Sequence, residues 1–210
     1  MVTIRLPPPT RNVSPVVTIL PPKTKLIRIY DPTKYSAKAL SFRSIGPISR
    51  FDHHKTSPDL KPQLDPERSI IYGAFTLSSC LVEIFGDFDI IEVKQQQVAS
   101  IELTKSLTLL DLRGNNAMKA GTVSAISKTA NRNLSQTWSR YFYEQSSLYG
   151  EIDGLIYSNA HNDEDAVALY QRAITKLTLA KVQTMSLNHP ALRSAIFQIA
   201  QNHSLLVSPY

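Results

Sequence analysis

This chain of 210 residues contains one cysteine, no long apolar run and no apolar segment typical of a signal peptide. Its single cysteine, Cys80, excludes an intrachain disulfide and a cysteine-based zinc site, and its place among apolar residues favours a core role. No apolar run approaches the roughly 20 residues that cross a bilayer, and Pro7-Pro8-Pro9 interrupts the segment where a signal peptide would be apolar. We therefore expect a cytoplasmic protein without membrane association.

Common catalytic motifs are missing as well. The chain has no G-x-G-x-x-G and no G-x-x-x-x-G-K-[ST], which argues against a Rossmann crevice and a P-loop. It also lacks H-E-x-x-H and G-x-S-x-G. The one adjacent histidine pair, His53-His54, falls in a polar loop, where neighbouring side chains do not readily converge on one metal ion. We expect both histidines to be solvated and no metal to be bound.

Acidic residues are absent from both ends of the chain. Residues 1–28 contain five cations and residues 166–210 contain four, in a chain whose formal net charge is +6. Basic ends attract nucleic acid, an acidic partner or a dinucleotide pyrophosphate. No aromatic-interleaved basic ridge or zinc finger accompanies the charge, so we expect no direct contact with nucleic acid.

The proline pattern divides the chain into an arm and one domain. Residues 1–24 are rich in proline and basic side chains and are predicted to be an extended arm, whereas residues 25–210 suffice for a single domain with a substantial core. A proline-containing loop at residues 52–67 is placed to act as a lid. Strands are predicted at residues 26–30, 71–74, 88–93, 107–112, 154–159, 177–185 and 205–207, and helices at 76–85, 122–130, 133–145, 163–174 and 189–201. Strands and helices mixed without a regular βαβ alternation predict an α+β fold with mixed or antiparallel sheets and flanking helices.

A glutamate inside an uncharged helix is the most informative feature. Apolar side chains recur at helical spacing over residues 76–85, at Leu77, Cys80, Leu81 and Ile84. Glu83 lies on the flank of that stripe, and the helix contains no Lys or Arg to pair with it. Such a carboxylate either reaches water, as an ordinary helix-flank residue does, or lies in a pocket that sets its protonation and reactivity.

Other polar side chains stand next to predicted strands. Arg28 and Tyr30 share one face of the strand at residues 26–30. Arg50 follows a turn, Tyr72 lies in the strand that leads to Glu83, and Ser158 ends a buried strand.

The ordered set Arg28, Arg50, Tyr72, Glu83 and Ser158 resembles the RES domain family, which is named for its Arg, Glu and Ser. The resemblance extends over residues 25–175. Members of that family are similar in fold to ADP-ribosyltransferase toxins, and known members are toxins of toxin–antitoxin pairs that consume NAD by phosphorolysis or hydrolysis, or transfer ADP-ribose to a protein. Many relatives carry a Tyr directly after the first Arg, where this chain has Ile29; Tyr30 is the candidate replacement.

The resemblance implies an ADP-ribosyltransferase-like domain that uses NAD as its substrate, with inorganic phosphate as a second substrate if the bond is broken by phosphorolysis. It also implies an Xre-like antitoxin as partner, through which any contact with nucleic acid would be indirect. Basic ends and the loop at residues 52–67 are the surfaces where we expect that partner.

Cleavage of the nicotinamide–ribose bond has several requirements, and each candidate residue could meet one of them. Nicotinamide leaves as a neutral group, so an oxocarbenium-like ribose is what must be stabilised, and Glu83 is the candidate for this. Arg28 and Arg50 would hold pyrophosphate oxygens. Tyr72 is the candidate to stack on nicotinamide, and Ser158 to position a ribose or phosphate oxygen.

Two other functions fit the same residues. A protein ADP-ribosyltransferase would break the same bond and pass the ADP-ribose to a protein. A catalytically inactive basic interaction module would use Arg28 and Glu83 as a structural salt bridge. Incubation with NAD separates all three readings.

Overall fold

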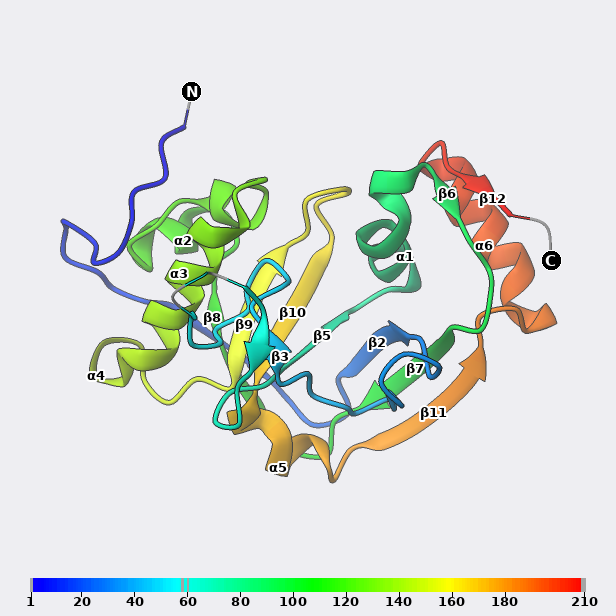
Figure 1. The fold of residues 1–210 in the computed structure, drawn as a ribbon, viewed down its shortest axis with the longest axis horizontal. Coiled ribbons are helices and arrows are strands. Elements are labelled where there is room, and N and C mark those ends of the chain that lie inside the picture. Colours follow the sequence, from blue (N-terminus) through cyan, green and yellow to red (C-terminus); the bar gives the residue numbers. More distant parts are fainter. Residues whose placement is uncertain (1, 58, 60, 209–210) are drawn as a thin grey trace.

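The computed structural model describes residues 2–57, 59 and 61–208; residues 1, 58, 60, 209 and 210, among them Pro58 of the loop expected to act as a lid, lie outside that part. Within it, eight strands form one curled sheet in the order β1-β8-β9-β10-β5-β2-β7-β11 (Figure 1). The strands span Val17–Leu20 (β1), Lys25–Tyr30 (β2), Ile70–Ala74 (β5), Gln97–Glu102 (β7), Leu107–Asp111 (β8), Gly154–Ser158 (β9), Asp165–Tyr170 (β10) and Lys181–Ser186 (β11).

Neighbouring strands run antiparallel except for the parallel pair of β8 and β9. Parallel neighbours need a long crossover, and here it carries three helices, α2 (Asn115–Lys119), α3 (Arg132–Glu144) and α4 (Ser146–Tyr149). Figure 1 shows these helices at the β8–β9 end of the molecule, while α1 (Leu77–Phe85) and α6 (Pro190–Asn202) lie at the other end. The mixed sheet with flanking helices in one domain confirms the predicted α+β class.

Short elements complete the fold. Two small ladders join β3 (Ile45–Gly46) to β4 (Gln63–Leu64) and β6 (Ile90–Ile91) to β12 (Leu206–Val207). The remaining short helical segments are Gly86–Phe88, Ser124–Ser127, Gln171–Ala173 and α5 (Ile174–Leu177). The helix predicted at residues 122–130 is thus reduced to one 3-10 turn.

The apolar core lies on both faces of the sheet. Along β10, Ala166 and Ala168 belong to one buried cluster, whereas Val167 and Leu169 belong to the other. Successive side chains of a strand point to opposite faces, so the two clusters cover the two sides of the sheet. No helix in the described residues combines the length and apolarity needed to cross a bilayer.

Helix α1 forms where the apolar stripe predicted it. Thr76 caps the helix, because its hydroxyl oxygen accepts a hydrogen bond from the Ser79 backbone N–H at 2.9 Å. Cys80 and Leu81 are buried, with 6% and 0% of their surface exposed, and fix this face against the core. The prediction that Cys80 is a core residue is confirmed.

The helix predicted at residues 163–174 is wrong. Residues Asp165–Tyr170 instead form β10, a central strand that pairs with both β5 and β9. The acidic residues that suggested a helix start serve other contacts: Asp165 pairs with Arg113, and Glu164 accepts hydrogen bonds from Ser78 and Asn162. Pairing on both edges of the strand outweighs the local helix-start pattern.

Two strands of the sheet have no counterpart in the sequence-based prediction. β7 lies between β2 and β11, and β1 forms the outer edge beside β8. β1 falls within the segment predicted as an extended arm, so part of that segment belongs to the sheet.

The sheet is open between β2 and β5. Among the described residues, β2 and β5 are paired in register at a single position, Ile27 with Ala74, whereas β2 and β7 are paired along their whole length. Beyond Ile27 the two strands therefore part and leave space between them.

Candidate active site

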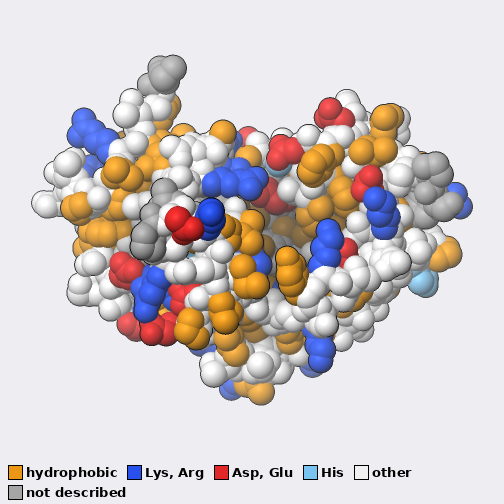
Figure 2. Space-filling model, viewed as in Figure 1, with side chains coloured by type: hydrophobic (Ala, Val, Ile, Leu, Met, Phe, Trp, Pro, Cys, Tyr) orange, Lys and Arg blue, Asp and Glu red, His pale blue; other side chains and the backbone are white. Residues whose placement is uncertain are grey.

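The opening between β2 and β5 contains a cavity of about 640 Å³. Its walls come from both strands, from α1, from β9 and from the segment at residues 34–50. Figure 2 shows a hollow in the middle of this face of the molecule, bordered by basic and hydrophobic side chains. Volumes of this size are typical of sites for small molecules and cofactors.

Four of the six residues singled out in the sequence line this cavity. Arg28, Arg50, Tyr72 and Glu83 come from β2, the turn after β3, β5 and α1, and the fold brings them into one space. Tyr30 is not among the lining residues; its ring lies 5.9 Å from the Arg28 guanidinium carbon and packs against the second core cluster.

Ser158 does not line the cavity either. It pairs in register with Asp165 at the end of β9. Tyr157, one residue earlier, is the lining residue, and strand alternation places the Ser158 side chain on the opposite face. The sequence predicted this strand correctly, but it did not show which of its side chains would face the cavity.

The Glu83 carboxylate lies close enough to Arg50 and Tyr157 to interact with both electrostatically. About a third of its side chain is exposed, at 35%. Partial burial raises the pKa of Glu83, while the positive charge of Arg50 and the neighbouring His161 lower it. Burial and the nearby Glu83 charge together raise the pKa of the Tyr157 hydroxyl far above its usual value. Of the two alternatives that the sequence left open for Glu83, its place in the cavity lining and the shift of its pKa favour the pocket.

Arg28 is a buried cation held by backbone carbonyls. Its Nη1 donates to Ser41 O at 2.8 Å and to Ala39 O at 3.3 Å. Burial lowers the pKa of Arg28 to about 10, so the guanidinium stays charged at neutral pH. Within the described residues it has no ion pair with a carboxylate, and the salt bridge to Glu83 expected for an inactive module is not formed.

Arg50 and Arg132 are also unneutralised. Arg50 Nη1 donates to the Thr129 carbonyl, and its buried Nε has no hydrogen-bond partner in the described structure. Arg132 reaches the Ile48 carbonyl only at 3.5 Å. Neither arginine has a carboxylate partner among the described residues, so both retain capacity for a ligand anion.

A buried carboxylate that the sequence did not single out anchors the cavity wall. Asp52 has no exposed surface and accepts the Tyr72 hydroxyl at 2.8 Å. Arg43 Nη2 lies 2.8 Å from both of its oxygens, and the backbone N–H groups of Ile48 and Ser49 donate to it at 2.6 and 2.9 Å. Asp52 therefore connects two lining residues, Tyr72 and Arg43, to the turn that carries Arg50.

The expectation that His53 and His54 are solvated is wrong, because both side chains are fully buried. His53 Nε2 lies 2.7 Å from Gln171 Oε1, and its ring packs 4.5 Å from the ring of Tyr143. Burial lowers the pKa of His53 to about 3, so this ring is neutral. The start of the loop at residues 52–67 is therefore core, and of its other residues that the structure describes, only Leu64 lines the cavity.

The cavity lining carries an excess of positive charge over the single carboxylate of Glu83. Arg43 pairs with Asp52 and Lys34 with Asp31, and the unpaired excess comes from the guanidinium groups described above, those of Arg28, Arg50 and Arg132. No group of three or more His, Cys, Asp or Glu residues in the described chain could hold a metal ion. An excess of cationic side chains in the lining favours an anionic ligand.

Comparisons with known proteins identify the family and the fold. A "Probable toxin y4kH" of Sinorhizobium fredii is 32% identical over 91 residues, which cover 43% of this chain and 68% of that protein. A chain in the crystal structure of the M. tuberculosis MbcT–MbcA toxin–antitoxin complex shares the fold, with a TM-score of 0.50 and 15% identity over 86% of this chain and 88% of that one. The model of the RES domain matches residues 25–192, and the chain therefore belongs to the RES domain family.

Proposed function

We propose that this protein is a RES-type toxin that cleaves the nicotinamide–ribose bond of NAD and is restrained by an antitoxin. The observation that carries the proposal is a cavity with several arginines that have no carboxylate partner in the described chain and a single carboxylate, Glu83. NAD has the matching chemistry, because its pyrophosphate is an anion and its nicotinamide ring bears a positive charge that passes to the ribose as the glycosidic bond breaks.

Glu83 supplies the electrostatic part of the reaction. As the glycosidic bond breaks, positive charge moves from the nicotinamide ring to the ribose, and a fixed carboxylate stabilises the oxocarbenium-like sugar. Burial raises the pKa of Glu83 in the free protein. A bound cationic nicotinamide favours the ionised form, so substrate binding itself prepares the carboxylate.

The arginines hold the substrate. Arg28, Arg50 and Arg132 lie around the cavity without carboxylate partners in the described chain, and guanidinium groups bind phosphate oxygens through charge-assisted, often bidentate hydrogen bonds. Tyr72 offers an aromatic face to the nicotinamide, with its hydroxyl already fixed by Asp52. Inorganic phosphate, if it is the attacking group, would meet the same basic lining.

An apolar rim supports the presence of a protein partner. Five lining residues are also exposed hydrophobic side chains, with exposed fractions from 39% to 91%: Tyr35, Ile45, Ile48, Leu64 and Ile84. Contiguous exposed apolar side chains around a cavity mouth are typical of protein interaction sites. An antitoxin that covers this rim would close the cavity to NAD.

One assay tests the proposed activity. The purified protein is incubated with NAD, with and without inorganic phosphate, and free nicotinamide and any modified protein are measured. Nicotinamide release without protein modification supports NAD degradation, and its dependence on phosphate identifies the acceptor. Modification of a protein supports an ADP-ribosyltransferase. A folded protein that does neither contradicts the proposal.

A further inference from the structure

A histidine behind the cavity joins two carboxylates at the end of α1. His161 Nδ1 lies 3.7 Å from Glu83 Oε2, and its Nε2 lies 3.1 Å from Asp87 Oδ1. Glu83 and Asp87 are four residues apart and so lie on the same side of the chain. An imidazole flanked by acceptor oxygens on both ring nitrogens is best satisfied when both nitrogens carry protons.

The position of this ring is fixed by its surroundings. A Cβ atom added to Gly86 would lie 2.5 Å from His161 Cδ2, so the ring packs directly on the Gly86 backbone. Asn159, which is fully buried, accepts a hydrogen bond from the His161 backbone N–H at 2.9 Å and donates to Ser79 Oγ of α1 at 2.7 Å. The loop after β9 is thereby tied to the helix that carries Glu83.

We propose that His161 is a positioning residue that orients the Glu83 carboxylate and partly balances its charge, so that the acid limb of the rate profile depends on this histidine. The inference rests on the proposed role of Glu83 and adds a second residue through which that role is controlled. His161 is not among the residues that line the cavity, so it acts through Glu83 and not on the substrate.

The sign of the pH effect follows from the groups around Glu83. Arg50 and His161 lower the pKa of Glu83, whereas burial and Asp87 raise it; Tyr157 and Cys80 are the other titratable side chains that interact with it. The ionised carboxylate is the active form, so activity rises with pH through this pKa. Loss of His161 removes one of the groups that lower the pKa of Glu83, and so moves the acid limb of the rate profile to higher pH.

Two substitutions test this relationship in different ways. His161→Gln removes the charge, and Gly86→Ala displaces the ring without removing a titratable group. We expect both to shift the acid limb of kcat for NAD cleavage upward by about one pH unit, the lower end of the effect of one neighbouring opposite charge. At pH values where Glu83 is fully ionised, the rates should approach that of the wild type.

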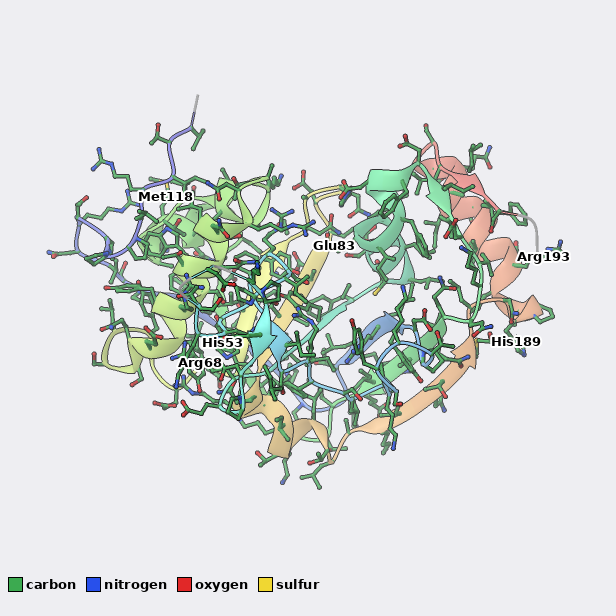
Figure 3. The ribbon with its side chains drawn as sticks, in the orientation of Figure 1. His53, Arg68, Glu83, Met118, His189 and Arg193 are labelled. Carbon is green, nitrogen blue, oxygen red and sulfur yellow. The ribbon has the colours of Figure 1, made fainter. Side chains whose placement is uncertain are left out.

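His189→Asn is the matched control. His189 caps α6 and lies at the edge of the molecule, well apart from Glu83 (Figure 3). The His189 Nδ1 atom accepts from the Ala191 backbone N–H, and asparagine keeps a side-chain acceptor at this cap while it removes the imidazole. We expect the pH profile of this variant to match that of the wild type.

A readout that does not need catalysis separates this inference from the proposed function. In a carboxyl-carbon NMR titration, the Glu83 resonance should titrate at a higher pH in the His161→Gln variant than in the wild type. Failure of the wild type to cleave NAD contradicts the proposed function, and the titration then still decides whether His161 controls Glu83. An unchanged Glu83 titration, or an equal loss of activity at every pH, overturns the inference.

Discussion

The hydroxyl of Tyr72 donates a hydrogen bond of 2.8 Å to Asp52, and the same hydroxyl accepts one from the Phe51 backbone N–H at 3.1 Å. These two hydrogen bonds fix Tyr72, a β5 residue of the cavity wall, to Phe51 and Asp52, which lie 21 and 20 residues earlier in the chain. Burial and the charge of Asp52 raise the pKa of this hydroxyl well above its usual value, so it stays protonated and donates at neutral pH.

Tyr72→Phe should lower the stability of the folded protein more than it lowers the rate of NAD cleavage. The ring stays in the cavity, but Asp52 loses one of its donors and Phe51 loses its acceptor, and we expect a loss of about 1–3 kcal/mol in the free energy of unfolding. Denaturant unfolding measures this loss. Tyr72→Ala also removes the aromatic face, so the KM for NAD should rise by an amount equivalent to about 0.5–1.5 kcal/mol. Equal KM values for the two variants would show that the ring does not contact nicotinamide.

Glu83→Gln should leave the fold intact and lower kcat for NAD cleavage by about two to three orders of magnitude, the range for loss of one group that stabilises charge in the transition state. The two side chains have nearly the same shape, so the substitution isolates the charge. Nicotinamide release measures the effect, and circular dichroism verifies folding. Wild-type turnover in the folded variant would contradict the role of Glu83.

The same substitution should stabilise the protein near neutral pH. Because burial raises the pKa of Glu83 above its value in the unfolded chain, the unfolded state loses this proton first as pH rises, and the wild type becomes less stable through that interval. Gln has no such proton to lose. Melting temperatures of the two proteins should therefore agree in acid and diverge toward neutral pH, with the variant higher. A variant that is less stable at neutral pH would refute this sign.

Arg28→Lys should impair NAD binding although the charge is kept. Arg28 Nη1 already donates to Ala39 and Ser41, so binding a phosphate oxygen requires the remaining nitrogens of the fork, and a lysine cannot serve both. We expect the KM for NAD to rise about tenfold, which corresponds to the loss of one charge-assisted hydrogen bond. Arg5→Lys, in an exposed part of the arm, is the control and should behave as wild type.

Expression of the chain without a partner should arrest bacterial growth while cellular NAD falls, because the proposed activity destroys a cofactor that the cell needs. Glu83→Gln, expressed to the same level, should be tolerated. Co-expression of a cognate antitoxin should restore growth, and substitution of the exposed rim residues Tyr35 and Leu64 by Asp should abolish that rescue. Normal growth with soluble, folded wild-type protein would argue for an interaction module.

Local sequence patterns predicted much of the fold and part of the candidate site. The apolar stripe of α1 and the alternation in β2 and β5 can be read within a few residues, and they placed Arg28, Tyr72 and Glu83 correctly enough to meet in one cavity. The register of β9 could not be read in this way, because Tyr157 and Ser158 are neighbours in a strand that is buried on both faces.

Other parts depend on contacts between distant residues. His53 is buried because Gln171, 118 positions away, and Tyr143 and Tyr170 surround it, and a polar loop sequence contains no sign of that. Asp52 became recognisable only through its contact with Tyr72. The acidic run before β10 resembles a helix start until its partners are known. Each of these errors arises where tertiary contacts override a local preference.

The sheet order also governs when the cavity can exist during synthesis. β5 spans Ile70–Ala74 and takes its second neighbour from β10 at Asp165–Tyr170, while β9, which supplies Tyr157, precedes β10 by only a few residues. Contacts of such long sequence separation form late, after the intervening chain has left the ribosome. A nascent chain therefore carries Arg28, Arg50 and Glu83 for most of its synthesis without a complete cavity, and the active geometry arises only when the last central strand joins the sheet.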